Sequence, residues 1–97
     1  MAINQTPLRF VPTGYGNGVC ANHVFAVLTT VSAPSKRLLA KARKEKRYVD
    51  ATCGRGMKSM LLLADGHVIG CAIKPATMLR RLNASEYEDE ESFEEEG

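Results

Sequence analysis

The spacing of apolar positions predicts short strands through most of the chain. Between residues 57 and 73 two apolar runs flank Asp65-Gly66, a dipeptide typical of a tight β-hairpin, so this segment predicts two antiparallel strands. Near the N-terminus the glycine-rich segment 14–18 predicts a turn, and the residues after it predict either two strands or one bent strand. The segments expected to contain strands are 8–14, 15–29, 48–52 and 57–73.

Between these strands one long segment, SAPSKRLLAKARKEKR, has helical spacing. Ser32 suits the N-cap and Pro34 is tolerated in the first turn. Lysine and arginine cover most of the helix surface, so we expect it to pack by one narrow apolar stripe. That stripe consists of Leu38, Leu39 and Ala42.

A second, shorter helix is predicted to begin at Pro75. Its spacing predicts an inward face and an outward face. The residues expected to point inward are Met78, Leu79 and Leu82, and those expected to point outward are Arg80 and Arg81. The element order β-β-α-β-β-β-α describes a small α+β domain with a mostly antiparallel sheet, one main basic helix and a short C-terminal helix.

Charge is divided unevenly along the chain. Residues 1–85 contain all 13 lysines and arginines and only three acids, a net charge of +10, whereas residues 86–97 contain eight acids and no base. An acidic run repels itself and buries little apolar surface, so we expect a folded domain at 1–84 and a disordered acidic tail at 85–97. The tail is either a solubilising segment or a tethered polyanion that competes for the basic surface of its own or a neighbouring subunit.

Motifs for catalysis, metal binding and nucleotide binding are weak. The glycine-rich segment lacks the Gly-Lys-Ser/Thr ending of a P-loop. A carboxylate pair would have to join Glu45 to Asp50, on a helix end and a strand, which is a poor arrangement for general acid-base catalysis. A Cys-His nucleophile is left open, although nothing favours it. The cysteines and histidines match no common structural zinc spacing; they are Cys20, His23, Cys53, His67 and Cys71.

These observations predict a non-enzymatic protein with free thiols and neither a metal nor a cofactor. No apolar run reaches the roughly 18 residues of a membrane span. The N-terminus also lacks a signal-peptide pattern. We therefore expect a cytoplasmic protein without membrane association.

The basic domain has the electrostatic footprint of a protein that binds a polyanion, and nucleic acid is the leading candidate. Its aromatic residues are not interleaved with basic residues in an exposed pattern, so we expect contact with the backbone of double-stranded DNA rather than base stacking on single strands. They are Phe10, Tyr15, Phe25 and Tyr48. The alternative is that the basic helix is simply a solvated face.

Five segments, in order and spacing, resemble the RemA family of small bacterial regulators of extracellular matrix genes. They are GYGNGVCANHVFAV, SAPSKRLLAKAR, VDATCGRG, DGHVI and AIKPATMLRRL. The resemblance extends from about Arg9 to Leu82. It implies a DNA-binding transcriptional activator that assembles into a ring, a subunit fold similar to LytTR DNA-binding domains, and control of extracellular matrix and biofilm genes. The small size of the domain agrees with obligate assembly.

The resemblance also implies which residues contact DNA. The arginine of the family's Asp-Ala-Thr-x-Gly-Arg motif is Arg55 here, between two glycines that allow close approach to a phosphate. The family usually has a second basic residue directly afterwards, where this chain has Gly56. It also usually has arginine after Ala-Asn, where this chain has His23.

These departures leave two interpretations open. Lys58 and the basic helix supply compensating phosphate contacts, or the chain has lost strong DNA binding and keeps the ring as a scaffold or protein-interaction module. We expect DNA binding to be retained but weaker and more salt-sensitive. The expected contact residues are Arg55, His23, Lys58, Lys36 and Arg37.

Overall fold

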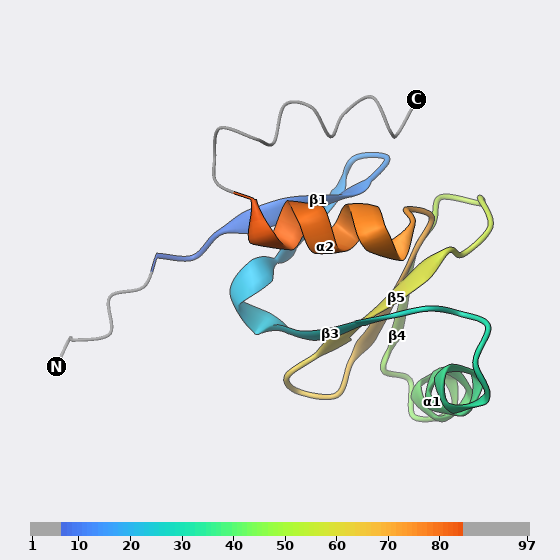
Figure 1. Ribbon diagram of the computed structural model, residues 1–97. Helices are drawn as coiled ribbons and strands as arrows, with labels where there is room; N and C mark the ends of the chain where they lie inside the picture. Colours follow the sequence, from blue (N-terminus) through green and yellow to red (C-terminus); the bar gives the residue numbers. More distant parts are fainter. Residues whose placement is uncertain (1–6, 85–97) are drawn as a thin grey trace, which may run out of the picture.

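The computed structural model describes residues 7–84, so the predicted acidic tail at 85–97 lies outside the described residues. The strands are β1 (Phe10–Gly14), β2 (Asn17–Cys20), β3 (Val24–Leu28), β4 (Tyr48–Ala51), β5 (Ser59–Leu63) and β6 (Val68–Cys71). The helices are the short 3-10 turn η1 (Ala21–His23), α1 (Ala33–Lys44) and α2 (Pro75–Asn83). Strands β1 and β2 form a two-stranded ribbon, and the remaining strands form a four-stranded sheet in the order β3-β5-β6-β4 (Figure 1).

The four-stranded sheet is mostly antiparallel and contains one parallel pair. Strand β5 pairs antiparallel with β3 and with β6, whereas β4 pairs parallel with β6. The chain leaves β3 at one edge of the sheet, crosses through α1 and enters β4 at the other edge, the kind of connection that parallel strands require. The α+β class and the mostly antiparallel pairing are therefore confirmed, with the strands divided between two sheets.

The segment for which the sequence left two alternatives forms two separate strands. Strand β2 ends at Cys20 and β3 begins at Val24, and the two belong to different sheets. Asn22, in η1 between them, holds the bend against the N-terminal segment. Its Oδ1 accepts the backbone N–H of Arg9 at 2.9 Å, and its Nδ2 donates to the carbonyl oxygen of Pro7 at 3.3 Å. The asparagine of the Ala-Asn pair thus fixes the junction between the two sheets.

The four-stranded sheet has a hydrophobic core on each face. Because successive residues of a strand point to opposite faces, Leu61 of β5 packs toward α2 and the ribbon, whereas Met60 packs toward α1. The buried residues of the first core are Val11, Val19, Leu61, Cys71, Ile73 and Met78. Those of the second core are Ala42, Met60 and Val68. Figure 1 shows α2 and the ribbon on one side of the sheet and α1 on the other.

Helix α1 begins and packs as its sequence predicts. The hydroxyl of Ser32 accepts the backbone N–H of Ser35 at 3.2 Å, which satisfies one of the free donors of the first turn. Ala42 is buried, and Leu38 and Leu39 are partly buried against the same core. The helix therefore packs by a narrow stripe and leaves its cations exposed.

Helix α2 begins at Pro75 as predicted, but two of its side chains point the opposite way from the prediction. Arg81 is fully buried and Leu79 is 48% exposed. The guanidinium of Arg81 donates to the carbonyl oxygen of Pro12 at 3.0 Å. A buried cation that finds a backbone acceptor in β1 can point inward, and Met78, three residues earlier on the same face, is buried beside it.

The predicted hairpin between β5 and β6 is confirmed. Gly66 has a φ of +95°, and its N–H donates to the carbonyl oxygen of Leu63 at 3.0 Å. The Asp65 carboxylate accepts the N–H of His67 at 3.0 Å, so the Asp-Gly pair closes the turn with side chain and backbone together. Within residues 7–84, no helix has the length and apolar character needed to cross a membrane.

Candidate nucleic-acid interface

The loop between β4 and β5, residues 52–58, is shaped by its own polar groups. One carboxylate oxygen of Asp50 accepts both the N–H of Thr52 at 2.9 Å and its hydroxyl at 2.7 Å. Cys53 and Gly54 then have φ angles of +54° and +83°, and the N–H of Arg55 returns to the carbonyl oxygen of Thr52 at 3.0 Å. This tight turn carries Arg55 on its exposed side.

The loop rests on the turn between β1 and β2. Gly14, Tyr15 and Gly16 all have positive φ angles there, a conformation that two glycines adopt readily and that is unusual for tyrosine. Asn17 Nδ2 donates to Cys53 Sγ at 3.6 Å, and that thiol donates to the carbonyl oxygen of Tyr15 at 3.6 Å. The Gly-Tyr-Gly-Asn motif and the Asp-Ala-Thr-x-Gly-Arg motif, far apart in sequence, therefore meet in one structure.

The guanidinium of Arg55 stacks on the ring of Tyr15, with its central carbon 3.9 Å from the ring centroid. Arg55 is exposed and Tyr15 is half-buried against the larger core. Within residues 7–84, Arg55 forms no ion pair with a carboxylate. Alternation of aromatic and basic residues along the sequence does not indicate this pair, because Tyr15 and Arg55 lie on separate turns. Only the glycines on both sides of Tyr15 could have indicated its unusual position.

Two further positions of this loop bear on the predicted site. Lys58 is exposed and lies on the same loop as Arg55, at the point where the loop enters β5. Its N–H donates to the carbonyl oxygen of Cys71 at 2.7 Å. Gly56, where the family usually has a basic residue, has no positive φ and open space where a Cβ would lie. A Cβ added at Gly56 therefore meets no neighbouring atom within 4 Å.

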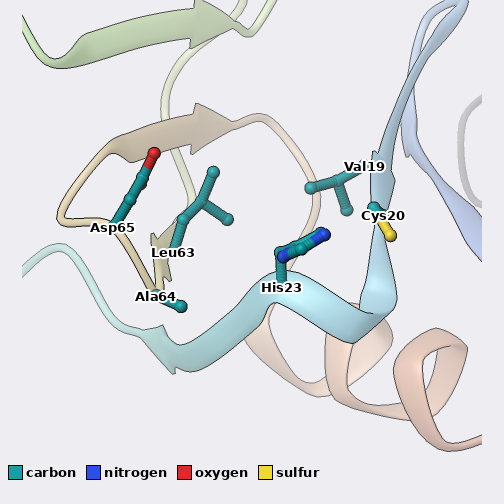
Figure 2. Close-up of a pocket in the computed structure, with 6 residues that line it drawn as sticks. All are labelled: Val19, Cys20, His23, Leu63, Ala64 and Asp65. Carbon is teal, nitrogen blue, oxygen red and sulfur yellow. The ribbon is translucent and has the colours of Figure 1, made fainter. Parts of the chain in front are cut away.

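His23 lies at the other end of β5 from Lys58. Its carbonyl oxygen accepts the N–H of Ala64 at 2.9 Å, and its exposed side chain lines a cavity of about 450 Å³. Figure 2 shows the imidazole between the end of β2 and the turn after β5, with the Cys20 sulfur pointing away from it. The five residues of β5 span roughly 17 Å at about 3.3 Å per residue. His23 and Lys58 therefore do not meet within one subunit.

Lys36 and Arg37 lie near the start of α1 and are exposed. Helix α1 precedes β4 and the Arg55 loop follows it, and Figure 1 shows α1 and this loop well apart. The structure therefore brings Arg55 and Lys58 onto one loop and leaves His23, Lys36 and Arg37 elsewhere.

The carboxylates of the described residues are engaged locally. The hydrogen bonds from Thr52 lower the pKa of Asp50, and those from His67 lower the pKa of Asp65, so both carboxylates stay ionised on their own turns. Glu45 lies 3.7 Å from the side-chain Nε of Arg47. Within residues 7–84, neither Arg55 nor Lys58 forms an ion pair with one of these carboxylates.

The three cysteines are free thiols, as predicted. Cys53 is exposed, Cys20 is half-buried and Cys71 is buried, and burial raises the pKa of Cys71 to about 11. In the part of the chain that the structure describes, no group of three or more histidine, cysteine or carboxylate side chains is placed to hold a metal ion.

This chain is similar to proteins that are named as regulatory proteins. A Bacillus cereus (strain AH187) protein named "Putative regulatory protein" is 40% identical over 84 residues, which cover 87% of this chain and 97% of that protein. A similarly named protein of Carboxydothermus hydrogenoformans is 36% identical over 83 residues, covering 86% of this chain and 95% of that protein.

The family model described as RemA-like, extracellular matrix regulatory protein A-like, matches residues 10–82. The chain therefore belongs to the RemA-like family, and the family inferred from the sequence motifs is confirmed. The match covers both motifs that meet at the Arg55 loop.

Proposed function

We propose that this chain is a DNA-binding transcriptional regulator that assembles into a ring of identical subunits and controls extracellular matrix and biofilm genes. It contacts the backbone of double-stranded DNA through an exposed basic rim. The observation that carries the proposal is the guanidinium of Arg55, exposed and stacked on Tyr15 at the tip of a tightly bonded loop. Membership of a matrix-regulatory family supports the regulatory part.

The stacked arginine suits a phosphate for two physical reasons. Its planar guanidinium presents paired N–H donors that match two phosphate oxygens. The Tyr15 ring holds one face of the guanidinium, so less side-chain freedom is lost when a phosphate binds. The edges of the guanidinium stay available because the aromatic ring occupies a face.

Assembly would overcome the separation of the basic residues within one subunit. Arg55 and Lys58 offer few contacts by themselves, and His23, Lys36 and Arg37 lie elsewhere. A ring repeats the Arg55 loop around its circumference, and weak phosphate contacts from several subunits then add through multivalency. The resulting affinity depends steeply on salt.

The test is a binding titration of the full-length chain against a labelled AT-rich promoter duplex at several salt concentrations, with Arg55→Ala and Arg43→Ala. Arg43 is a matched control because it is also an exposed arginine stacked on a tyrosine, 5.0 Å from the Tyr48 centroid. Both variants lose one charge per subunit, so a purely non-specific charge effect weakens them equally. We expect Arg55→Ala to lose about tenfold or more, roughly 1.4 kcal/mol, and Arg43→Ala much less.

Equal losses in the two variants would assign binding to overall charge rather than to the Arg55 loop. Absence of wild-type binding at low salt would instead favour the second candidate, a ring-forming scaffold or protein-interaction module. The specific observation behind that candidate is that His23 and Gly56 replace two expected permanent charges.

The proposal extends to the acidic residues 86–97, which lie outside the described residues. Eight acids tethered to the basic domain compete with DNA for its cations or recruit a basic partner. Replacing all eight by their amides should tighten DNA binding if the competition is intramolecular or between subunits. Unchanged affinity would remove the competition and leave recruitment or solubility as the role.

A further inference from the structure

A groove between edge strand β3 and helix α2 is an apolar feature that the proposed DNA interface does not use. It has a volume of about 280 Å³, and Val24, Phe25, Leu79 and Leu82 are among the residues that line it. Among the described residues that line it, none is charged. We call it the β3–α2 groove.

Two large apolar side chains of this groove are exposed to solvent, which is unfavourable for apolar groups. Phe25 is 75% exposed and Leu79 is 48% exposed. On α2, Met78 points into the core, while Leu79 and Leu82, three residues apart, form a neighbouring stripe that faces the groove. Because α2 is oriented with Arg81 facing inward, this second apolar stripe lies at the surface of the domain.

Among the described strands, β3 beside the groove also has a partner strand on one side only. Within residues 7–84, β3 pairs only with β5 and forms one edge of the sheet. Its sequence, VFAVL, contains no charge or proline of the kind that normally protects an edge from pairing with another chain. An apolar groove beside an unprotected edge is typical of a surface covered by protein.

We propose that the β3–α2 groove is the surface on which a second copy of this chain docks. This inference rests on the ring of the proposed function and names the face through which the ring forms. The charge of the molecule selects the occupant: the described residues carry 13 cations and three acids, so most faces repel an identical copy. The uncharged groove lets two copies meet without opposing their cations.

The position of the groove agrees with DNA binding by the assembled ring. The groove is formed by η1, β3 and the C-terminal half of α2, whereas Arg55 lies on the loop that rests on the β1–β2 turn. The Arg55 loop contributes no residue to the groove. A copy docked there leaves Arg55 exposed, and its own Arg55 continues the basic rim.

The test is the mass of the full-length protein in solution, measured by sedimentation velocity from about 1 to 100 µM. The variants are Phe25→Ser, Leu79→Gln and the double change. Val31→Ser is the control, because Val31 is 78% exposed in the loop before α1 and loses a similar kind of surface outside the groove. Circular dichroism and thermal melting establish that each variant is folded, and glutamine keeps a good helix former at position 79.

We expect wild type and Val31→Ser to sediment as the same multiple of the 10.6 kDa chain. The double variant should dissociate to smaller species, or require at least tenfold more protein to assemble. Assembly of the double variant equal to wild type would overturn the groove as the interface while leaving the ring intact. A wild-type protein that stays monomeric at every concentration would overturn both the ring and this inference.

DNA affinity separates this inference from the rest of the proposed function. Arg55→Ala should lose affinity and keep the wild-type mass. The folded double variant should lose both mass and affinity, because separate subunits cannot add their contacts. A double variant that dissociates but binds DNA as tightly as wild type would sustain the groove and overturn the multivalent mode of binding.

Discussion

Arg55 and Tyr15, forty positions apart in the chain, are stacked with 3.9 Å between the guanidinium carbon and the ring centroid. We expect Tyr15→Leu to weaken DNA binding a few-fold, since an exposed cation–π contact contributes about 0.5–1 kcal/mol. Tyr15→Phe keeps the aromatic face and should bind like wild type. Because neither change removes a charge, the dependence of affinity on salt should be the same in all three proteins. A Tyr15→Leu affinity equal to that of Tyr15→Phe would remove the stack from the mechanism.

A basic substitution at Gly56 should increase DNA affinity. Its Cβ position is open and its φ is not positive, so Gly56→Arg should fold normally and place a second permanent charge beside Arg55. We expect tighter DNA binding and a salt slope steeper by about one per contacting subunit. Gly56→Gln, of similar length but uncharged, is the control. If both variants bind equally, the added charge does not reach the DNA.

Part of the fold and of the candidate site follows from local sequence and part does not. The Ser32 cap and the Asp65-Gly66 turn were predictable because each depends on side chains acting on backbone groups a few residues away. The burial of Arg81 was not, because it depends on a carbonyl oxygen 69 positions away. The stacking of Arg55 on Tyr15 was not predictable for the same reason, since the two residues belong to separate loops.

The stability of the Arg55 loop should depend on whether the Asp50 carboxylate is ionised, and therefore on pH in the acid range. Hydrogen bonds from the Thr52 hydroxyl and N–H lower the pKa of Asp50, so its ionised form stabilises the loop above the ordinary aspartate range, near pH ~4. That contribution is lost as pH falls through the lowered pKa. Thr52→Val keeps the N–H and removes the hydroxyl, so the pKa of Asp50 should rise toward its ordinary value. A carboxyl NMR titration measures the shift, and an unchanged titration of Asp65 in the same sample is the control.

The cysteines should differ in reactivity at mildly alkaline pH. We expect iodoacetamide at about pH 8 to label exposed Cys53 first, half-buried Cys20 more slowly and buried Cys71 only after unfolding. Mass spectrometry of the labelled peptides gives the order. Modification of Cys71 at the rate of Cys53 would contradict its burial.

Cys71 also predicts a loss of stability in alkali. Burial raises its pKa to about 11, whereas an unfolded thiol titrates near ~8.5. Between these values the unfolded state releases the proton first, so the free energy of unfolding should fall as pH rises. In Cys71→Ala this part of the pH dependence should disappear, as measured by urea unfolding at each pH.

Gly70, in β6, is a position where added volume should lower stability. A Cβ there would lie 2.7 Å from Cε of Met57 and would also contact the hydroxyl of Tyr48. We expect Gly70→Ala to lower the free energy of unfolding by about 1–3 kcal/mol. Adding Tyr48→Phe removes the contacting hydroxyl and should recover part of that loss, a coupling that a double-mutant cycle measures. Independent, additive effects of the two changes would show that the tyrosine does not limit the space.

The order of strands in the main sheet has a consequence for how the domain reaches its native state. Strands β5 and β6 are neighbours both in the chain and at the centre of the sheet, so their hairpin closes by a short, fast loop. Strands β3 and β4 must then add from a distance, one on each side, with α1 passing between them. The central hairpin is thus the natural template for the rest, and its amide protons should exchange with solvent most slowly.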